Sequence, residues 1–251
     1  MARKLIAALA CRAGGSRLYG KPLQPLVAGV TVLDQILDTV EALPEIETAV
    51  LGISEGTENL IFVEAAKRRG VPYVVGDERD VLHRLVLCGR ATGATDVFRV
   101  TTECPFIWTE PFAEAWRSHV EKDRDITVTD GLPEGAIFEI YAQDALERSH
   151  ANGDERHRSE MCSLYAREHA DEFRLKTILP TPELDRPDIR LTIDNAEDLV
   201  LCREVYKALR EQAPLIPLAE IIAFLDGRPA LKALVEPYIT PVRIWPDSNV
   251  D

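Results

Sequence analysis

Apolar runs of strand length alternate with segments of helical period through the first half of the chain. The first run, residues 4–10, is almost continuously apolar and leads into a Gly-bearing loop, as expected for a central strand buried on both faces. Such alternation is typical of a mostly parallel sheet flanked by helices, with ligands at the carboxyl ends of the strands. The chain is therefore predicted to be an α/β protein.

The same periodicity places the other elements. Further strands are expected at residues 48–53, 71–75, 96–101 and 125–129. Helices are expected at 32–43, from the turn at 54–57 to about residue 69, at 80–92, and from 111 to about 119. The second half is less regular. Residues 131–141 and 173–179 are expected to form a smaller mixed sheet or flap around a helix near 154–169. A strand-like segment at 188–193 precedes three expected helices, at 196–209, 218–225 and 231–235. We expect one domain over residues 1–215 with an inserted lobe at roughly 131–185, then a helical extension and tail over 216–251.

Charge and cysteine usage narrow the classes of partner. The 29 Lys and Arg against 42 Asp and Glu give a formal net charge of −13, which repels nucleic-acid backbones and anionic lipid. The five cysteines are odd in number and form no CxxC pair, which fits neither a disulfide framework nor a zinc site. No run of about 18 apolar residues is present. We therefore expect a cytoplasmic protein that binds neither nucleic acid nor membrane.

The loop after the first strand, residues 11–23, reads CRAGGSRLYGKPL. Its adjacent glycines let backbone N–H groups approach a ligand and form an anion nest. Arg12, Arg17 and Lys21 supply the local cations that an acidic protein needs to bind a triphosphate. The loop is neither GxGxxG nor a Walker A motif, since Pro22 stands where that motif needs Ser or Thr. The alternative is a Gly-rich surface loop with solvated cations.

Two acidic residues follow other predicted strands. In FRVTTECP (98–105) a strand ends near Thr101 and Glu103 comes two residues later. In RLTIDNAEDL (190–199) Asp194 precedes Asn195, a plausible N-cap of the next helix. Carboxylates at strand ends suit a Mg²⁺ ion beside phosphates, but loop and helix capping explain each acid almost as well.

These segments resemble the nucleotidyltransferases that activate sugars, whose loop reads roughly RxGSxRLxGKxL, with Gly15 here in the place of the serine. The resemblance is closest to the cytidylyltransferase branch that includes spore-coat polysaccharide protein F and the CMP-sialate and CMP-Kdo synthetases. The two acidic segments resemble that family's VRITGDCPL and RLTVDTPEDL. GDERDVLHR (76–84), PEGAIFEI (133–140) and HRSE (157–160) resemble further family segments, in the same order along residues 3–210.

The resemblance implies a Rossmann-like three-layer α/β/α fold with a small inserted mixed β lobe. It implies nucleotide-binding roles for the following residues: Ala10, Arg12, Gly14, Gly15, Ser16, Arg17, Lys21, Asp80, Arg84 and Thr101. Among these, Arg12 and Lys21 would be catalytic, stabilising charge on the departing pyrophosphate. Glu103 and Asp194 would hold Mg²⁺, and Glu139, His157 and Arg158 would face the acceptor. A homodimer is expected by resemblance to dimeric relatives.

The activity implied is transfer of CMP from CTP to a sugar acid or related acceptor, with release of pyrophosphate, for surface-polysaccharide or glycoconjugate precursors. Two alternatives stay open on the same fold: a guanylyl- or thymidylyltransferase that makes an NDP-sugar, and a cytidylyltransferase that acts on a phosphonate. A third is a non-catalytic nucleotide-binding module, because Glu103 stands where the family has Asp.

Overall fold

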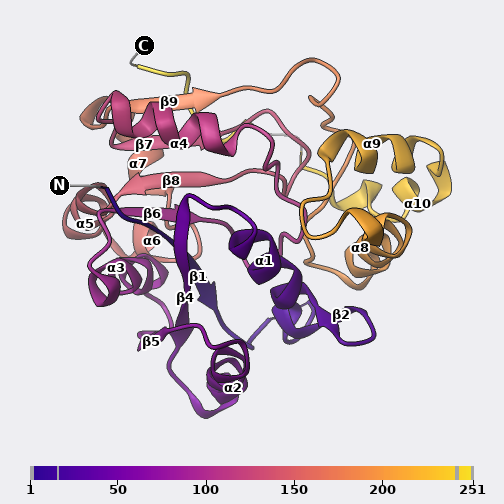
Figure 1. The fold of residues 1–251 in the computed structure, drawn as a ribbon, viewed down its shortest axis with the longest axis horizontal. Helices are drawn as coiled ribbons and strands as arrows, with labels where there is room; N and C mark the ends of the chain where they lie inside the picture. The colour runs from indigo at the N-terminus through magenta and orange to yellow at the C-terminus, as the bar shows by residue number, and fades with distance from the viewer. Residues whose placement is uncertain (1–2, 16, 241–242, 250–251) are drawn as a thin grey trace.

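The computed structural model describes residues 3–15, 17–240 and 243–249. Its centre is a mixed seven-stranded sheet (Figure 1), in which four of the six strand pairings are parallel and the two made by β8 are antiparallel. In spatial order the strands are β5 (Tyr73–Gly76), β4 (Ile46–Ser54), β1 (Leu5–Cys11), β6 (Asp96–Arg99), β8 (Glu139–Ala142), β7 (Ile126–Thr129) and β9 (Leu175–Ile178). A separate two-stranded hairpin, β2 (Pro25–Val27) and β3 (Val30–Thr31), packs against α8 (Ala196–Leu209).

Strand β1 shows why the molecule has three layers. Its side chains alternate between the two faces of the sheet, and both faces are buried. Leu5, Ala7 and Leu9 pack in one core with α1 (Val32–Glu41), α2 (Leu60–Arg69), α4 (Phe112–Glu121), α8 (Ala196–Leu209) and α9 (Leu218–Asp226). Ile6 and Ala8 pack in the other core with α3 (Val81–Thr92), α5 (Gln143–Asn152) and α7 (Leu164–Glu168). The predicted α/β architecture with a mostly parallel sheet is confirmed.

Local signals fix the ends of several helices. At α1, the Thr31 hydroxyl accepts the Asp34 backbone N–H (3.1 Å) while Asp34 accepts the Thr31 N–H (3.0 Å), a reciprocal capping box. Asp80 caps α3 by accepting the His83 N–H (2.8 Å). Gly70 ends α2 with φ 69°, a left-handed conformation that suits glycine.

The second half of the chain differs from the expected arrangement. Residues 131–141 and 173–179 were expected in a smaller sheet, but β8 and β9 belong to the main sheet, with β8 between β6 and β7. The helix expected near 154–169 is two short helices, α6 (Glu155–Arg158) and α7, and a full helix, α5, precedes them. Segment 188–193 forms no ladder and pairs only through one bridge between Glu134 and Arg190. The helices expected near the end are α9 and a shorter α10 (Pro229–Ala233).

The C-terminal segment returns to the sheet. The Asn249 N–H donates to the Leu175 carbonyl (3.2 Å) and the Ser248 hydroxyl accepts the Thr177 N–H (3.0 Å), so residues 248–249 lie along β9 (Figure 1). Trp245 is buried against the sheet with an exposed fraction of 3%. Residues 244–249 therefore pack against the β9 side of the main sheet.

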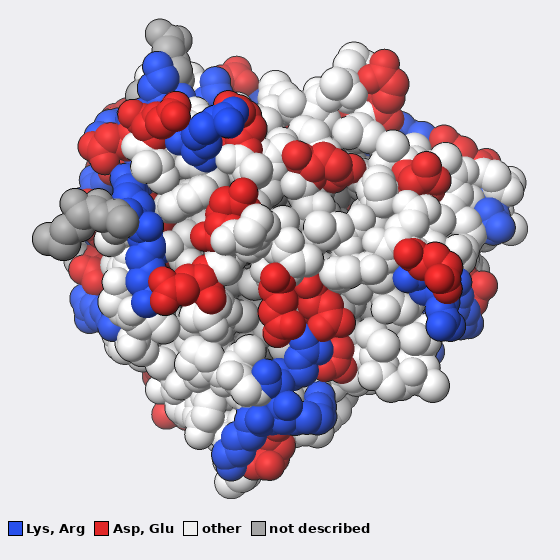
Figure 2. Space-filling view, in the orientation of Figure 1, with Lys and Arg blue, Asp and Glu red and all other residues white. Residues whose placement is uncertain are grey.

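The surface mixes the two signs of charge. On the face in Figure 2, Lys and Arg side chains lie next to Asp and Glu side chains rather than in a continuous basic field. Arg69 of α2, for example, contacts Asp38 (2.5 Å) and Glu41 (3.2 Å) of α1. Within the described part of the chain, no helix combines the length and apolar character needed to cross a membrane.

Candidate functional site

The loop that follows β1 is held in a fixed shape by its own backbone and by a buried asparagine. The Ala13 N–H donates to the Oδ1 atom of Asn59 (2.7 Å), and the Gly20 N–H returns to the Ala13 carbonyl (2.9 Å). A Cβ at Gly15 would lie 2.5 Å from the Leu18 carbonyl oxygen, so the loop can close on itself only with glycine there. The sequence therefore forms a compact turn at the carboxyl end of the central strand.

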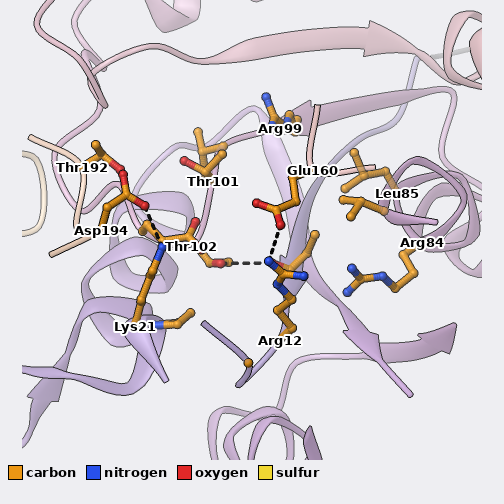
Figure 3. A pocket seen from close by; sticks show the side chains of 16 residues that line it. Arg12, Lys21, Arg84, Leu85, Arg99, Thr101, Thr102, Glu160, Thr192 and Asp194 are labelled. Atoms are coloured by element: carbon orange, nitrogen blue, oxygen red, sulfur yellow. Dashed lines mark hydrogen bonds and ion pairs between the residues drawn. The ribbon is translucent and has the colours of Figure 1, made fainter. Parts of the chain in front are cut away.

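This loop is one wall of a cavity of about 260 Å³, shown in Figure 3. The opposite walls come from the start of α3, from the end of β6 and the residues after it, and from the segment before α8. The side chains and backbone that line it belong to Ala10, Arg12, Gly14, Lys21, Pro22, Val81, Arg84, Leu85, Arg99, Val100, Thr101, Thr102, Glu103, Glu160, Thr192 and Asp194. Eight predicted site residues thus meet in one place: Ala10, Arg12, Gly14, Lys21, Arg84, Thr101, Glu103 and Asp194.

The cations of the loop are paired with carboxylates across the cavity. Lys21 Nζ lies 2.6 Å from Oδ1 of Asp194, and Arg12 pairs with Glu160 (Figure 3). Arg17 reaches the same Asp194 oxygen at 3.2 Å, although it does not line the cavity. Burial alone would raise the pKa of Asp194, but the hydrogen bond and charge of Lys21, with Arg190 and Arg17, hold it below its usual value. Asp194 is therefore an ionised carboxylate at the base of the cavity.

Arg84 is different, because it is buried without an acid. Its exposed fraction is 1%, and Nη1 donates to the carbonyls of Cys11 (3.0 Å) and Gly52 (2.9 Å) at the ends of β1 and β4. Its Nε atom has no hydrogen-bond partner, and no ion pair joins it to any residue that the structure describes. Burial lowers the pKa of this guanidinium from its ordinary value. A buried cation with spare donors at the edge of a cavity favours an anionic ligand there.

Glu103 and Asp194 lie on neighbouring segments that are joined by a backbone hydrogen bond. The Ile193 N–H donates to the Glu103 carbonyl (2.9 Å), and both acids line the cavity. Burial raises the pKa of Glu103 despite the charge of Lys21, and the nearby charge of Asp194 raises it further. Two carboxylates that line one partly buried cavity form an oxygen donor set that fits a hard divalent cation.

Asp194 is positioned by a buried arginine and by the start of α8. Arg190, exposed by 3%, contacts Oδ2 of Asp194 (2.5 Å), Oδ1 of Asp198 (2.9 Å) and Glu134. Asp198 also accepts the backbone N–H groups of Asp194 (2.9 Å) and Asn195 (2.8 Å). Asn195 is therefore the N-cap of α8, as expected, with Asp198 as its partner, whereas the Asp194 carboxylate takes no part in the cap and faces the cavity.

A second cavity of about 260 Å³ adjoins the first and shares six lining residues with it, namely Arg99, Val100, Thr101, Glu160, Thr192 and Asp194. Its far wall includes Glu139, Arg167 and Ile244. Glu139 is 1% exposed and accepts hydrogen bonds from Arg99 (2.8 Å), Tyr141 (3.2 Å) and the Trp245 indole (3.1 Å). The two cavities together form a continuous space with Asp194 at their junction.

Some predicted residues lie elsewhere. His157 is absent from the linings of both cavities, and its Nε2 atom contacts Glu168 (3.0 Å) while Nδ1 contacts Asp154 (2.7 Å), within its own segment. Arg158 donates to the carbonyls of His150 and Gly153 (3.0 Å each) at the end of α5. These contacts give His157 and Arg158 structural roles in the α5–α7 segment, and contact with an acceptor stays a prediction.

The remaining predictions concern the nucleotide. Asp80 does not line the first cavity but a neighbouring one, beside Arg12 and Arg158. Gly15 shapes the loop without lining the cavity. Ser16 lies outside the described residues.

Three residues were missed by the sequence analysis as parts of the site. Arg190 could have been found from its position four residues before Asp194, where a cation can reach the carboxylate. Glu160 ends the HRSE segment, and nothing in that segment indicates that it reaches Arg12. Trp245 reaches Glu139 from 106 residues away in sequence, which no local pattern can indicate.

The thiols of the site are unsuited to nucleophilic catalysis. All five cysteines are buried, and burial raises the pKa of the Cys104 thiol to about 11. A thiol with such a pKa stays protonated near neutral pH, so its nucleophilic form is scarce. The chemistry of this cavity is therefore that of its cations and carboxylates.

Comparisons with known proteins agree with this geometry. The sequence profile of a family described as Cytidylyltransferase matches residues 6–224. The spore coat polysaccharide biosynthesis protein SpsF of Bacillus subtilis is 28% identical over 224 residues, which are 87% of this chain and 92% of that protein. A solved cytidylyltransferase from Leptospira borgpetersenii superposes with a TM-score of 0.82 at 20% identity, covering 92% of this chain and 97% of that one. A CMP-2-keto-3-deoxy-manno-octonic acid synthetase, solved in complex with CTP, superposes with a TM-score of 0.60 at 12% identity, covering 83% and 99%.

Proposed function

Because the chain belongs to the cytidylyltransferase family, we propose that it transfers CMP from CTP to a sugar acid or related acceptor and releases pyrophosphate. The observation that carries the proposal is the meeting of four cationic side chains with three carboxylates in one cavity: Arg12, Lys21, Arg84 and Arg99 with Glu103, Glu160 and Asp194. The cations match a triphosphate, and the adjoining cavity past Asp194 offers room for a second substrate. The relationship to SpsF supports a role in surface-polysaccharide precursor synthesis.

In the proposed reaction an oxygen of the acceptor attacks the α-phosphorus of CTP. The new bond joins that oxygen to the α-phosphorus, and the bond to the β-phosphate bridging oxygen breaks, so pyrophosphate leaves with the electron pair while the acceptor oxygen loses its proton to solvent. Arg12, Lys21 and the N–H groups of the loop at residues 12–15 stabilise the charge that moves onto pyrophosphate. Positioning and electrostatics account for most of the rate in such transfers, and no covalent intermediate with the protein is needed.

Mg²⁺ is the proposed metal, with Glu103 and Asp194 as its protein ligands. When bound there, it would neutralise phosphate charge and polarise the α-phosphate. The ammonium of Lys21 lies 2.6 Å from Oδ1 of Asp194. The chain's own part would be to release this oxygen as Lys21 turns to the phosphates. Arg190 keeps the carboxylate oriented through its other oxygen during this exchange.

Isothermal titration with CTP, UTP, GTP and dTTP in the presence of Mg²⁺ tests the nucleotide. Pyrophosphate release with CTP and a panel of 2-keto-3-deoxy sugar acids tests the transfer. Tighter binding of GTP or dTTP than CTP would contradict the proposal, and retained CTP binding without release for any acceptor would favour a non-catalytic role.

Glu103→Gln and Asp194→Asn test the metal ligands. Each is expected to lower magnesium-dependent turnover by at least about a hundredfold, since preorganised charge at the transferring phosphate is lost. The matched control is Asp247→Asn, because the Asp247 side chain is 83% exposed, lies outside the cavity linings and pairs with Arg243. If both site variants keep full activity, the two-carboxylate metal site is wrong.

A further inference from the structure

Two histidines and an aspartate come together at the junction of α3 and α5, outside both cavities of the proposed active site. Asp80 is the N-cap of α3, His83 lies in the first turn of that helix, and His150 lies in the last turn of α5. A hydrogen bond joins the two helices, since the Gln143 side chain of α5 donates to the Val86 carbonyl of α3 (3.2 Å). All three clustered side chains are partly exposed. The cluster is therefore built on packed helices rather than on a free loop.

The donor atoms of the cluster already converge. His150 Nε2 lies 2.8 Å from Oδ2 of Asp80, while Oδ1 of the same carboxylate is occupied by the His83 backbone N–H (2.8 Å). The two imidazole rings stack with centroids 4.9 Å apart and an angle of 22° between their planes. One donor atom of each residue lies within 4.8 Å of the other two. The edge of a tetrahedral zinc site is about 3.3 Å, so small side-chain rotations would suffice to bind an ion.

The two histidine rings contact each other, and the His150 ring also contacts Asp80. The His83 ring makes no hydrogen bond or ion pair with any residue in the described part of the chain, and it stacks on the His150 ring. Stacking the two imidazoles places two metal-ligating nitrogens side by side. A bound cation would satisfy both rings and the carboxylate at once.

From this geometry we propose that Asp80, His83 and His150 bind a divalent transition-metal ion, with Zn²⁺ as the ion whose preferences fit. Two imidazoles and one carboxylate are a common zinc ligand set, with a water molecule completing the tetrahedron. Mg²⁺ prefers oxygen ligands only, so this site and the carboxylate pair at Glu103 and Asp194 select different ions.

The ion would connect the loop before α3 to the end of α5. The α5 end leads through α6 to Glu160, which pairs with Arg12 across the nucleotide cavity. Arg158 already fixes that end by donating to the His150 carbonyl (3.0 Å). Metal binding therefore stabilises the segment that supplies one wall of the proposed active site, without contributing a ligand to it.

Titration of the metal-free, tag-free protein with Co²⁺ tests the site, because Co²⁺ substitutes for Zn²⁺ and reports tetrahedral coordination by visible absorption. The wild-type protein is expected to bind one equivalent with tetrahedral absorption that Zn²⁺ displaces. His83→Ala and His150→Ala are each expected to weaken this binding by more than about a hundredfold, since the loss of outer partners alone costs 10- to 100-fold. Zn²⁺ should also raise the melting temperature of the wild-type protein but not of these variants.

Two controls identify the site. His169→Ala removes another partly buried histidine, one that stacks on Tyr165, and should leave Co²⁺ binding unchanged. Asp194→Asn should also leave it unchanged, which separates this site from the proposed magnesium site. If the alanine variant of His150 fails to fold, His150→Gln keeps a polar partner for Asp80 and gives the same test. Wild-type affinity in both histidine variants, or loss of the signal in Asp194→Asn, would overturn the proposal.

Discussion

At the scale of single residues, Glu139 is an acid that both joins a buried hydrogen-bond network and lines a cavity. Arg99, Tyr141 and Trp245 all donate to its carboxylate, which is almost fully enclosed in β8. Glu139→Gln would leave Arg99, whose side chain is 14% exposed, without its counter-charge. Breaking a buried ion pair by removing one partner costs about 3–5 kcal/mol, and the partial exposure of Arg99 places the expected loss of unfolding free energy at about 2–3 kcal/mol.

Urea denaturation measures this loss. The control is Glu160→Gln, which makes the same chemical change at an acid of the same cavity whose side chain is 71% exposed, and it should shift stability by less than about 0.5 kcal/mol. Equal stability of the two variants would show that Glu139 is not the centre of a buried network.

The raised pKa of Glu103 predicts how the free energy of unfolding changes with pH. Its folded pKa is raised above the ordinary value of 4.5 by burial, with a further contribution from Asp194, so the folded protein holds this proton more tightly than the unfolded chain. The stability that this group contributes is complete below about pH 4.5 and is lost as the pH rises through the folded pKa. Glu103→Gln is neutral at every pH and escapes this loss. In metal-free buffer, the variant's unfolding free energy should therefore gain on that of the wild type as the pH rises from 4.5 to 8, and a constant difference would contradict the raised pKa.

At the scale of elements, the sequence predicted what local signals determine. The helix expected at 196–209 has those bounds because Asn195 and Asp198 form its start, and both residues are visible in the sequence. The meeting of the loop after β1 with Glu103 and Asp194 at one cavity could be predicted, because each follows a segment of strong periodicity and resembles a family motif. Their roles in binding and catalysis stay predictions. The main errors came from non-local pairing. A four-residue strand such as β8 has no periodicity of its own, and its place between β6 and β7 depends on partners about 40 and 13 residues away.

The C-terminal segment is the element that sequence patterns described least. Ile244 and Trp245 donate their backbone N–H groups to Oδ2 of Asp130 (3.0 and 2.7 Å), and the Trp245 ring packs in the core beside Tyr141. Trp245→Ala should lower the unfolding free energy by about 3–5 kcal/mol, because it opens a cavity and removes a donor to Glu139. Thermal and urea unfolding measure the change. Asp247→Ala, two residues away and exposed, should change it by less than about 0.5 kcal/mol, and similar effects of both variants would show that the segment is not anchored by its tryptophan.

At the scale of the whole molecule, the packing indicates whether the residues after 215 fold together with the domain that precedes them. The sequence predicts a domain over residues 1–215 that is followed by a helical extension and tail over 216–251. Ile216, Leu218 and Leu225 are buried in the same core as β1 and α1, and the Gln35 side chain donates to the Pro214 carbonyl (2.8 Å). The Leu218 N–H also donates to Glu110 (3.0 Å), which precedes α4. These contacts favour one cooperative unit over two.

The full chain is therefore expected to unfold in a single transition in calorimetry, with equal calorimetric and van't Hoff enthalpies. A chain that ends at residue 215 should be severely destabilised, because without the side chains of α9 an apolar face of the core is exposed to water. Burial of each such side chain is worth about 1.5–3 kcal/mol, so the loss of three or more approaches the whole stability of a typical domain. A shortened chain with native-like melting, or two separate transitions in the full chain, would instead support the division at residue 215.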